Sequence, residues 1–141
     1  MIAYSMLSIG QDIPERIHNP TNVELFRFSA ATGNPHRIHY DQAYARREGY
    51  EDVLVQGPLH GSLIIQYLLD WAGAEAKIRT ISWENRRYAL VREALKFCGR
   101  VIKKWEENHS YCIHCKVTEG TLEGTICVQA SVVLVIPRDP K

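Results

Sequence analysis

Residues 58–72 constrain the fold of this chain more than any other segment. In a helix, their apolar side chains would cover most of the circumference: Leu59, Leu63, Ile64, Ile65, Tyr67, Leu68, Leu69, Trp71 and Ala72. A helix that is apolar nearly all round is buried nearly all round. Pro58 suits the first helical position and Gly73 suits the end. The rest of the chain is therefore expected to surround this helix.

The second half of the chain shows the two-residue period of β-strands. Strands are expected at residues 79–88, within 90–104, at 110–118 and at 125–136. The turn-rich stretch 119–124 separates the last two and predicts a hairpin connection. One central helix followed by an antiparallel meander is an α+β layout, in which the sheet wraps around a single buried helix.

The first half is expected to be mixed. Residues 9–19 favour a strand or arm, and 23–31 favour a helix. A polar loop at 32–41 is followed by a short helix at 42–47 and a short buried strand at 53–55. With 141 residues, the whole chain (1–141) is predicted to be a single domain.

The composition excludes several classes of protein. Apolar residues make up 45% of the chain, which argues against disorder. The formal net charge is only +1 and the basic residues are scattered, so no nucleic-acid partner is expected. The N-terminus lacks the features of a signal peptide, and no apolar run reaches the ~20 residues that span a bilayer. A soluble, cytoplasmic protein without a membrane partner is the simplest prediction.

Cys112 and Cys115 have the C-x-x-C spacing of half a zinc site. They fall within the expected strand 110–118, where positions three apart point to opposite faces. Cys98 and Cys127 are isolated, so no second pair is available. Reduced, packed thiols are therefore predicted in place of a metal site.

The polar loop places Asn34, His36, His39 and Asp41 shortly before the buried helix. Asp41 is expected to cap the helix that follows it. From these residues alone the loop has three interpretations: a hydrogen-bonded turn, a metal site with two histidines and a carboxylate, or an acid/base site. A polar loop that faces the start of a buried helix can combine an acid/base group with a backbone N–H that polarises a carbonyl.

The loop also carries a family resemblance. Residues 32–41 read T-G-N-P-H-R-I-H-Y-D, which resembles the hydratase-2 motif S-G-D-x-N-P-x-H-x-D of the MaoC-like hot-dog hydratases. Residues 55–59, V-Q-G-P-L, resemble the H-G-M element that follows in that family. The form of both segments is most similar to the branch of 3-hydroxyacyl-thioester dehydratases type 2 and mesaconyl-CoA hydratases.

The resemblance implies a hot-dog fold and an (R)-specific enoyl-thioester hydratase or 3-hydroxyacyl-thioester dehydratase, which is a hydro-lyase. The implied substrate is a 2-enoyl group on coenzyme A or an acyl-carrier protein. No cofactor or metal is implied. The expected assembly is a homodimer, or a heterodimer with another hot-dog subunit.

The resemblance also assigns roles to individual residues. His39 falls on the family's catalytic histidine, and Gly57 on the glycine whose backbone N–H binds the thioester oxygen. His36 lies in the N-P positions of the motif and is a candidate substrate-binding residue. Asn34 falls on the catalytic aspartate, which is a departure from the main pattern. Because an amide cannot act as a general base, His39 is expected to transfer the proton while Asn34 orients the water.

Asn34 keeps an alternative open, namely a non-catalytic hot-dog subunit that completes a partner's pocket or binds acyl groups. A hot-dog thioesterase is a further alternative. It is disfavoured because the polar loop matches hydration chemistry, and because the first turns of the central helix offer no evident carboxylate for hydrolysis.

Overall fold

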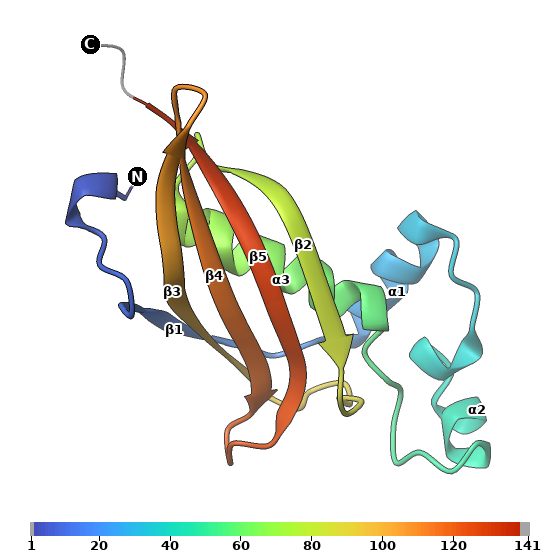
Figure 1. Ribbon diagram of the computed structural model, residues 1–141. Helices are drawn as coiled ribbons and strands as arrows, with labels where there is room; N and C mark the ends of the chain where they lie inside the picture. Colours follow the sequence, from blue (N-terminus) through green and yellow to red (C-terminus); the bar gives the residue numbers. More distant parts are fainter. Residues whose placement is uncertain (1, 139–141) are drawn as a thin grey trace.

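Residues 2–138 are described by a computed structural model, in which one sheet curves around one long helix (Figure 1). The sheet is antiparallel and five-stranded, in the order β1-β3-β4-β5-β2. The elements are η1 (Tyr4–Met6), β1 (Asp12–His18), α1 (Asn22–Thr32), η2 (Arg37–His39), α2 (Gln42–Arg47), α3 (Gly57–Ala72), β2 (Lys77–Asn85), β3 (Leu95–Glu107), β4 (Ser110–Thr121) and β5 (Ile126–Pro137).

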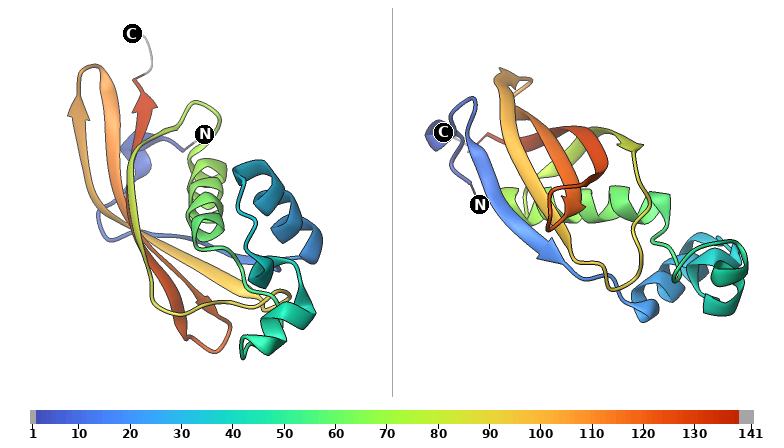
Figure 2. Two further views of the ribbon diagram at one scale, coloured as in Figure 1. Left: turned by 90° about the vertical axis from the view of Figure 1, so that its right-hand side faces the viewer. Right: turned by 90° about the horizontal axis from the view of Figure 1, so that it is seen from below.

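Helix α3 lies in the curve of the sheet, and α1 lies on the side of α3 that faces away from it (Figure 2). The shorter α2 lies beyond the N-terminal end of α3 (Figure 1). A sheet wrapped around a single buried helix is the hot-dog arrangement. The prediction of an α+β hot-dog fold is therefore confirmed.

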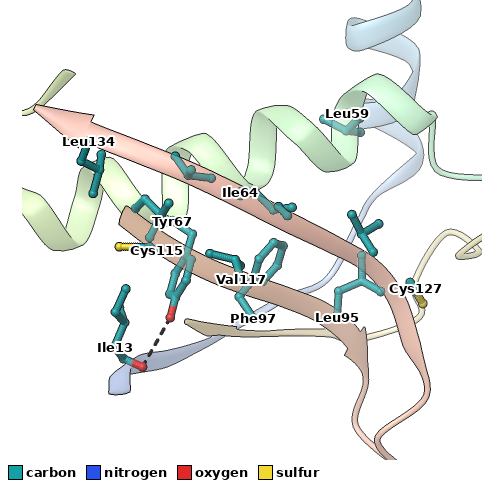
Figure 3. Packing of buried hydrophobic residues seen from close by; sticks show 14 of the residues in the cluster. Ile13, Leu59, Ile64, Tyr67, Leu95, Phe97, Cys115, Val117, Cys127 and Leu134 are labelled. Atoms are coloured by element: carbon teal, nitrogen blue, oxygen red, sulfur yellow. Dashed lines mark hydrogen bonds between the residues drawn. The ribbon is translucent and has the colours of Figure 1, made fainter. Parts of the chain in front are cut away.

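The core lies between α3 and the inner face of the sheet (Figure 3). Alternate residues of the three long strands point inward and are buried, among them Leu95, Phe97, Val101, Ile113, Cys115, Val117, Val128, Val132 and Leu134. From the helix, Ile64 and Leu68 are fully buried against them. The hydroxyl of Tyr67 donates to the carbonyls of Ile13 (3.4 Å) and Pro14 (3.0 Å), which attaches the helix to β1.

The expected four-strand meander is wrong at its first strand. Strand β2 pairs with β5, whereas β3 pairs with β1, so only β3, β4 and β5 form a meander. The expected strand at 53–55 is also wrong, because it is a single β-bridge between Leu54 and Leu90. Residues 89–91, which lie between β2 and β3, hydrogen-bond to residues 53–55 through Val55 N–H to Ala89 O and Val91 N–H to Val53 O. This connection leads from β2, at one edge of the sheet, to β3, which lies beside the opposite edge strand β1.

The expected connection at 119–124 is wrong at its start, because β4 continues to Thr121. Glu119 therefore lies inside the protein and is fully buried. Helix α3 begins at Gly57, one residue before the expected start, with Pro58 second. Helices α1 and α2 form where they were predicted.

The four cysteines are free, as predicted. Cys115 belongs to the core cluster, whereas the Cys112 sulfur lies 3.6 Å from the guanidinium of Arg79. The two thiols of the C-x-x-C pair thus point to opposite faces of β4. Burial raises the pKa of the Cys115 thiol to about 12, which keeps it protonated and unreactive at neutral pH.

Within residues 2–138, no helix has both the length and the apolar character required to cross a membrane.

Truncating the buried face of α3 should destabilise the protein strongly. Ile64 is 0% exposed, so Ile64→Ala leaves a cavity and is expected to lower the free energy of unfolding by about 2–5 kcal/mol. Ile17 on β1 is 57% exposed, so the same truncation there should cost less than about 1 kcal/mol. Urea denaturation of both variants measures the difference. Equal losses would contradict the placement of α3 at the centre of the core.

Candidate active site

The polar loop begins where α1 ends. Gly33 takes the left-handed conformation (φ +66°) that terminates the helix, and its N–H and that of Asn34 both donate to the Ser29 carbonyl. The chain reverses there. Downstream, the Tyr40 hydroxyl donates to the Pro35 carbonyl (2.7 Å). The loop is therefore held by its own hydrogen bonds.

Asp41 caps α2 as predicted, because its carboxylate accepts from the Tyr44 N–H at 3.0 Å. The same carboxylate forms an ion pair with Arg37 at 2.5 Å. Hydrogen bonds from Tyr44 and Arg37 lower the pKa of Asp41. Asp41 is thus a structural anchor at the end of the loop.

His39 is 9% exposed and lies in the 3₁₀ turn η2. Its Nδ1 lies 2.8 Å from the carbonyl oxygen of Leu54. A carbonyl only accepts hydrogen bonds, so Nδ1 carries the proton and Nε2 keeps a free lone pair. Burial lowers the pKa of His39; the Leu54 bond opposes this effect and nearby His36 adds to it. His39 is therefore a neutral imidazole that can accept a proton at Nε2.

His36 and Asn34 line the same loop. The His36 ring lies 6.0 Å from the His39 ring, centroid to centroid, and its Nδ1 accepts from the Ile38 N–H at 3.3 Å. The side-chain oxygen of Asn34 accepts from the His36 N–H at 3.3 Å. The oxygen expected to orient a water is thus engaged by the loop itself. The NH₂ group of Asn34 is the part that remains for a ligand.

The start of α3 presents a backbone donor. The N–H groups of Leu59 and His60 both donate to the Gln56 carbonyl, and Pro58 has no N–H. Among the residues that the structure describes, no acceptor pairs with the N–H of Gly57. A free N–H at the positive end of a helix dipole favours an oxygen that gains negative charge.

Gln56 fixes the position of this helix start. Its side chain is fully buried and donates to the Leu25 carbonyl (2.7 Å) and to the Ser29 hydroxyl (2.9 Å), both on α1. Sequence reasoning gave Gln56 no such role. These two hydrogen bonds connect the start of α3 to α1, the helix that the polar loop follows.

One short segment joins the two halves of the site. The Leu54 carbonyl orients His39, and Gly57 follows three residues later. Three residues of chain span no more than about 11 Å. The predicted site residues Asn34, His36, His39 and Gly57 are therefore all carried by the loop and the segment that binds it.

Sequence reasoning missed a buried pair beside the first turn of α3. Nδ1 of His60 lies 2.5 Å from Oε1 of Glu119, and both side chains are buried. The first turns of α3 themselves carry no carboxylate, as expected, and Glu119 comes to His60 from β4. The alternation of inward residues at Ile113, Cys115 and Val117 continues to Glu119, so a longer reading of the strand period would have found it.

The alternative of a metal site is not supported by the arrangement of these residues. Across residues 2–138, no group of three or more histidine, cysteine, aspartate or glutamate side chains is placed to hold a metal ion. The Nδ1 atoms of His36 and His39 are both engaged by the backbone, and Asp41 is occupied by Arg37.

A groove of about 600 Å³ lies near the start of α3. It is bordered by residues of α1 and the chain before it, including Val23, Phe28 and Ala31, and it reaches Leu59 of α3. Its lining does not include His39 or Asn34. The groove thus offers an apolar surface beside the candidate site.

Comparison with known proteins identifies the family. Residues 8–91, more than half of the chain, match the sequence profile of hydroxyacyl-thioester dehydratase type 2. The chain belongs to this family. The matched part contains the polar loop, the start of α3 and β2.

Two curated proteins are similar to this chain over part of their length. "Hydroxyacyl-thioester dehydratase type 2, mitochondrial" of Saccharomyces cerevisiae is 32% identical over 79 residues, which cover 55% of this chain and 28% of the yeast protein. "Mesaconyl-C(4)-CoA hydratase" of Chloroflexus aurantiacus is 56% identical over 43 residues, which cover 30% of this chain and 15% of that protein. The match thus spans less than a third of either relative.

Solved structures share the fold of this family member. The R-hydratase PhaJ1 of Pseudomonas aeruginosa superposes with a TM-score of 0.83 at 21% identity, covering 96% of this chain and 86% of that one. A chain of the ChsH1–ChsH2 complex of Mycobacterium tuberculosis superposes with a TM-score of 0.81 at 24% identity, covering 93% and 99%. At these identities the likeness concerns the fold.

The protonation of His39 can be measured by NMR. At neutral pH, ¹⁵N shifts should show the proton on Nδ1, and the titration midpoint should lie below the ordinary value of about 6.5. Because the folded pKa is lowered, the unfolded chain binds more protons between that pKa and about 6.5, so stability should fall as the pH is lowered through this window. His39→Gln assigns the resonance and should remove this part of the pH dependence. A midpoint above 6.5 would contradict the neutral-base assignment.

Proposed function

We propose that this protein catalyses the reversible addition of water to the C2=C3 bond of a 2-enoyl thioester, forming the (R)-3-hydroxyacyl thioester. The supporting observation is the free Nε2 of a neutral His39, held by the same segment that presents the unpaired Gly57 N–H. Acid/base chemistry and carbonyl polarisation are the two requirements of this reaction.

In the hydration direction, Nε2 of His39 takes a proton from water while the water oxygen bonds to C3. The NH₂ group of Asn34 donates to the water oxygen and fixes its position. The π electrons of the C2=C3 bond move toward the thioester, whose oxygen becomes enolate-like. The Gly57 N–H and the dipole of α3 stabilise that negative charge.

The reaction is completed when the His39 imidazolium returns the proton to C2. One hydrogen then resides on C2 and one hydroxyl on C3, so the atoms of water are accounted for and His39 is neutral again. Dehydration follows the same steps in reverse. No step requires a metal or another cofactor.

The acyl group is carried by coenzyme A or an acyl-carrier protein in this proposal. The names of the family and of the Chloroflexus relative, which specify hydroxyacyl-thioester and CoA, support a thioester substrate. The (R) configuration rests on the motif resemblance. A cytoplasmic location stays a prediction, since the yeast relative is named as mitochondrial.

We further propose that a second hot-dog unit pairs along β2, either another copy or a different subunit. Strand β2 is hydrogen-bonded to β5 on one side only and lies at the edge of the sheet. Most of its residues are exposed. An open edge of nine residues is a site for strand pairing.

The alternative function is a non-catalytic subunit that supports a partner's site. Asn34 favours it, because the motif carries an aspartate at this position. A thioesterase has less support, because the carboxylate of Glu119 is fully buried and bound to His60 rather than open to water.

The proposal is tested with crotonyl-CoA and the purified protein alone. Loss of the enoyl-thioester absorbance is expected, and His39→Gln should slow it about 10²- to 10⁴-fold, as removal of a general base does. His109→Asn is the control, since His109 is exposed in the β3–β4 turn with a positive φ that asparagine tolerates. Activity that appears only with a partner subunit would favour the alternative, and release of free thiol would indicate a thioesterase.

Variants of Asn34 test the orientation of the water. Asn34→Ala removes the side chain that fixes the water, whereas Asn34→Asp supplies the carboxylate that the motif carries at this position. Asn34→Ala should therefore cost much more activity than Asn34→Asp, which is expected to preserve activity or change it modestly. Circular dichroism should show that both variants remain folded. Equal turnover in the wild type and in Asn34→Ala would remove Asn34 from the mechanism.

A further inference from the structure

Two glycines one turn apart on α3 face the inner side of β2. A Cβ on Gly61 would lie 2.8 Å from the Trp83 ring, and a Cβ on Gly57 would lie 2.9 Å from Nδ2 of Asn85. Trp83 and Asn85 are two residues apart on β2 and therefore share a face. We call these four residues the α3–β2 contact. The Trp83 ring leaves no room for a side chain at Gly61, whereas the amide beside Gly57 is the end of a flexible side chain.

The carboxamide of Asn85 is the polar part of this contact. Its side chain is exposed, and within residues 2–138 it has no hydrogen-bond partner. Asparagine is disfavoured in strands, so packing alone does not account for it at the end of β2. Its NH₂ group supplies two donors. A free side-chain donor thus lies beside the free backbone donor of Gly57.

The two donors are close enough to share one oxygen. A backbone nitrogen lies about 2.5 Å from the Cβ position of its own residue. Because Nδ2 of Asn85 is 2.9 Å from that position, the two nitrogens are at most about 5.4 Å apart. Two N–H groups that each bond an oxygen at about 2.9 Å can be up to about 5.8 Å apart. The separation of the two nitrogens therefore permits them to share a single acceptor.

We propose that Asn85 donates a second hydrogen bond to the thioester oxygen and forms, with the Gly57 N–H, a two-donor site for the enolate-like charge. This inference rests on the proposed function, because it concerns the same oxygen. Asn85 is neutral, so it stabilises the developing charge without binding the ground-state carbonyl strongly. The Trp83 ring lies against Gly61, one turn farther along α3, and covers the next part of the contact.

Asn85→Asp is the sharpest test, because it keeps the shape of the side chain but replaces the donors with acceptors. With crotonyl-CoA, kcat is expected to fall about 10- to 100-fold in Asn85→Ala and at least as much in Asn85→Asp, with KM changed less than about threefold. Asn108→Gly is the control, because Asn108 is exposed in the β3–β4 turn and has a positive φ that glycine tolerates. If Asn85 only packs against α3, Asn85→Asp should keep near wild-type activity. That result would overturn the proposal.

A double-mutant cycle with Gly57→Ala tests whether Asn85 acts at this position. The new methyl group should displace the Asn85 amide, which is the end of a flexible side chain, so the variant should fold and lose activity. Asn85→Ala should then add less than about threefold to the loss in Gly57→Ala. Full additivity of the two losses would place Asn85 outside the oxygen site.

A spectroscopic readout separates this inference from the proposed function. Cinnamoyl-CoA is a conjugated thioester that resists hydration, and hydrogen bonds to its carbonyl shift its absorbance to longer wavelength. The shift on binding should be smaller with Asn85→Asp than with the wild type. An equal shift would overturn the role of Asn85 even if crotonyl-CoA is hydrated. An inert wild type that still shows the Asn85-dependent shift would defeat only the proposed reaction.

Discussion

The hydrogen bond between the His39 ring and the Leu54 carbonyl is the contact on which the candidate site depends. It fixes the tautomer of His39 and ties the polar loop to the segment that begins α3. Gln56 makes the parallel connection from that segment to α1. Both bonds are buried, so water competes little with them. The acid/base group and the helix start are thereby positioned by the same four residues, 54–57.

The two ends of α3 differ in what surrounds them. Toward Ala72 the buried partners are apolar, whereas near Gly57 the buried side chains include Gln56, His60 and Glu119. Polar groups inside a protein lower stability unless they are paired, and one side-chain oxygen each of Gln56 and Glu119 has no partner within residues 2–138. The end of α3 beside the polar loop is therefore the less stably packed end, which is a common property of sites that bind ligands.

The sequence was sufficient to predict the elements whose determining interactions are local. The apolar circumference identified α3, and Asp41 and the motif residues identified the short helix and the loop before it. It was insufficient where distant segments meet. A two-residue period identifies β2 but not its neighbour, so its pairing with β5 was not predictable. Gly120 resembles a turn residue, but it lies in β4, where the Thr125 carbonyl occupies its Cβ position and leaves no room for a side chain.

For the site, the motif placed Asn34, His36 and His39 on one loop but could not give their hydrogen bonds. The position of Gln56 depends on its hydrogen bonds to α1, and the role proposed for Asn85 depends on its contact with α3. In both cases the contacting residues lie far apart in the sequence. The pairing of Glu119 with His60, 59 residues apart, belongs to the same class. Such contacts follow from the wrapping of the sheet and not from any local pattern.

Asparagine at position 34 has a consistent electrostatic consequence. A carboxylate five residues before His39 in the same loop would favour the imidazolium and raise its pKa. With an amide there, burial dominates and the pKa of His39 is lowered, so Nε2 is free at neutral pH. A less basic imidazole is a weaker proton acceptor from water. The proposed reaction would then depend more on stabilising the enolate-like oxygen, the role proposed for the donors at the start of α3 and the end of β2.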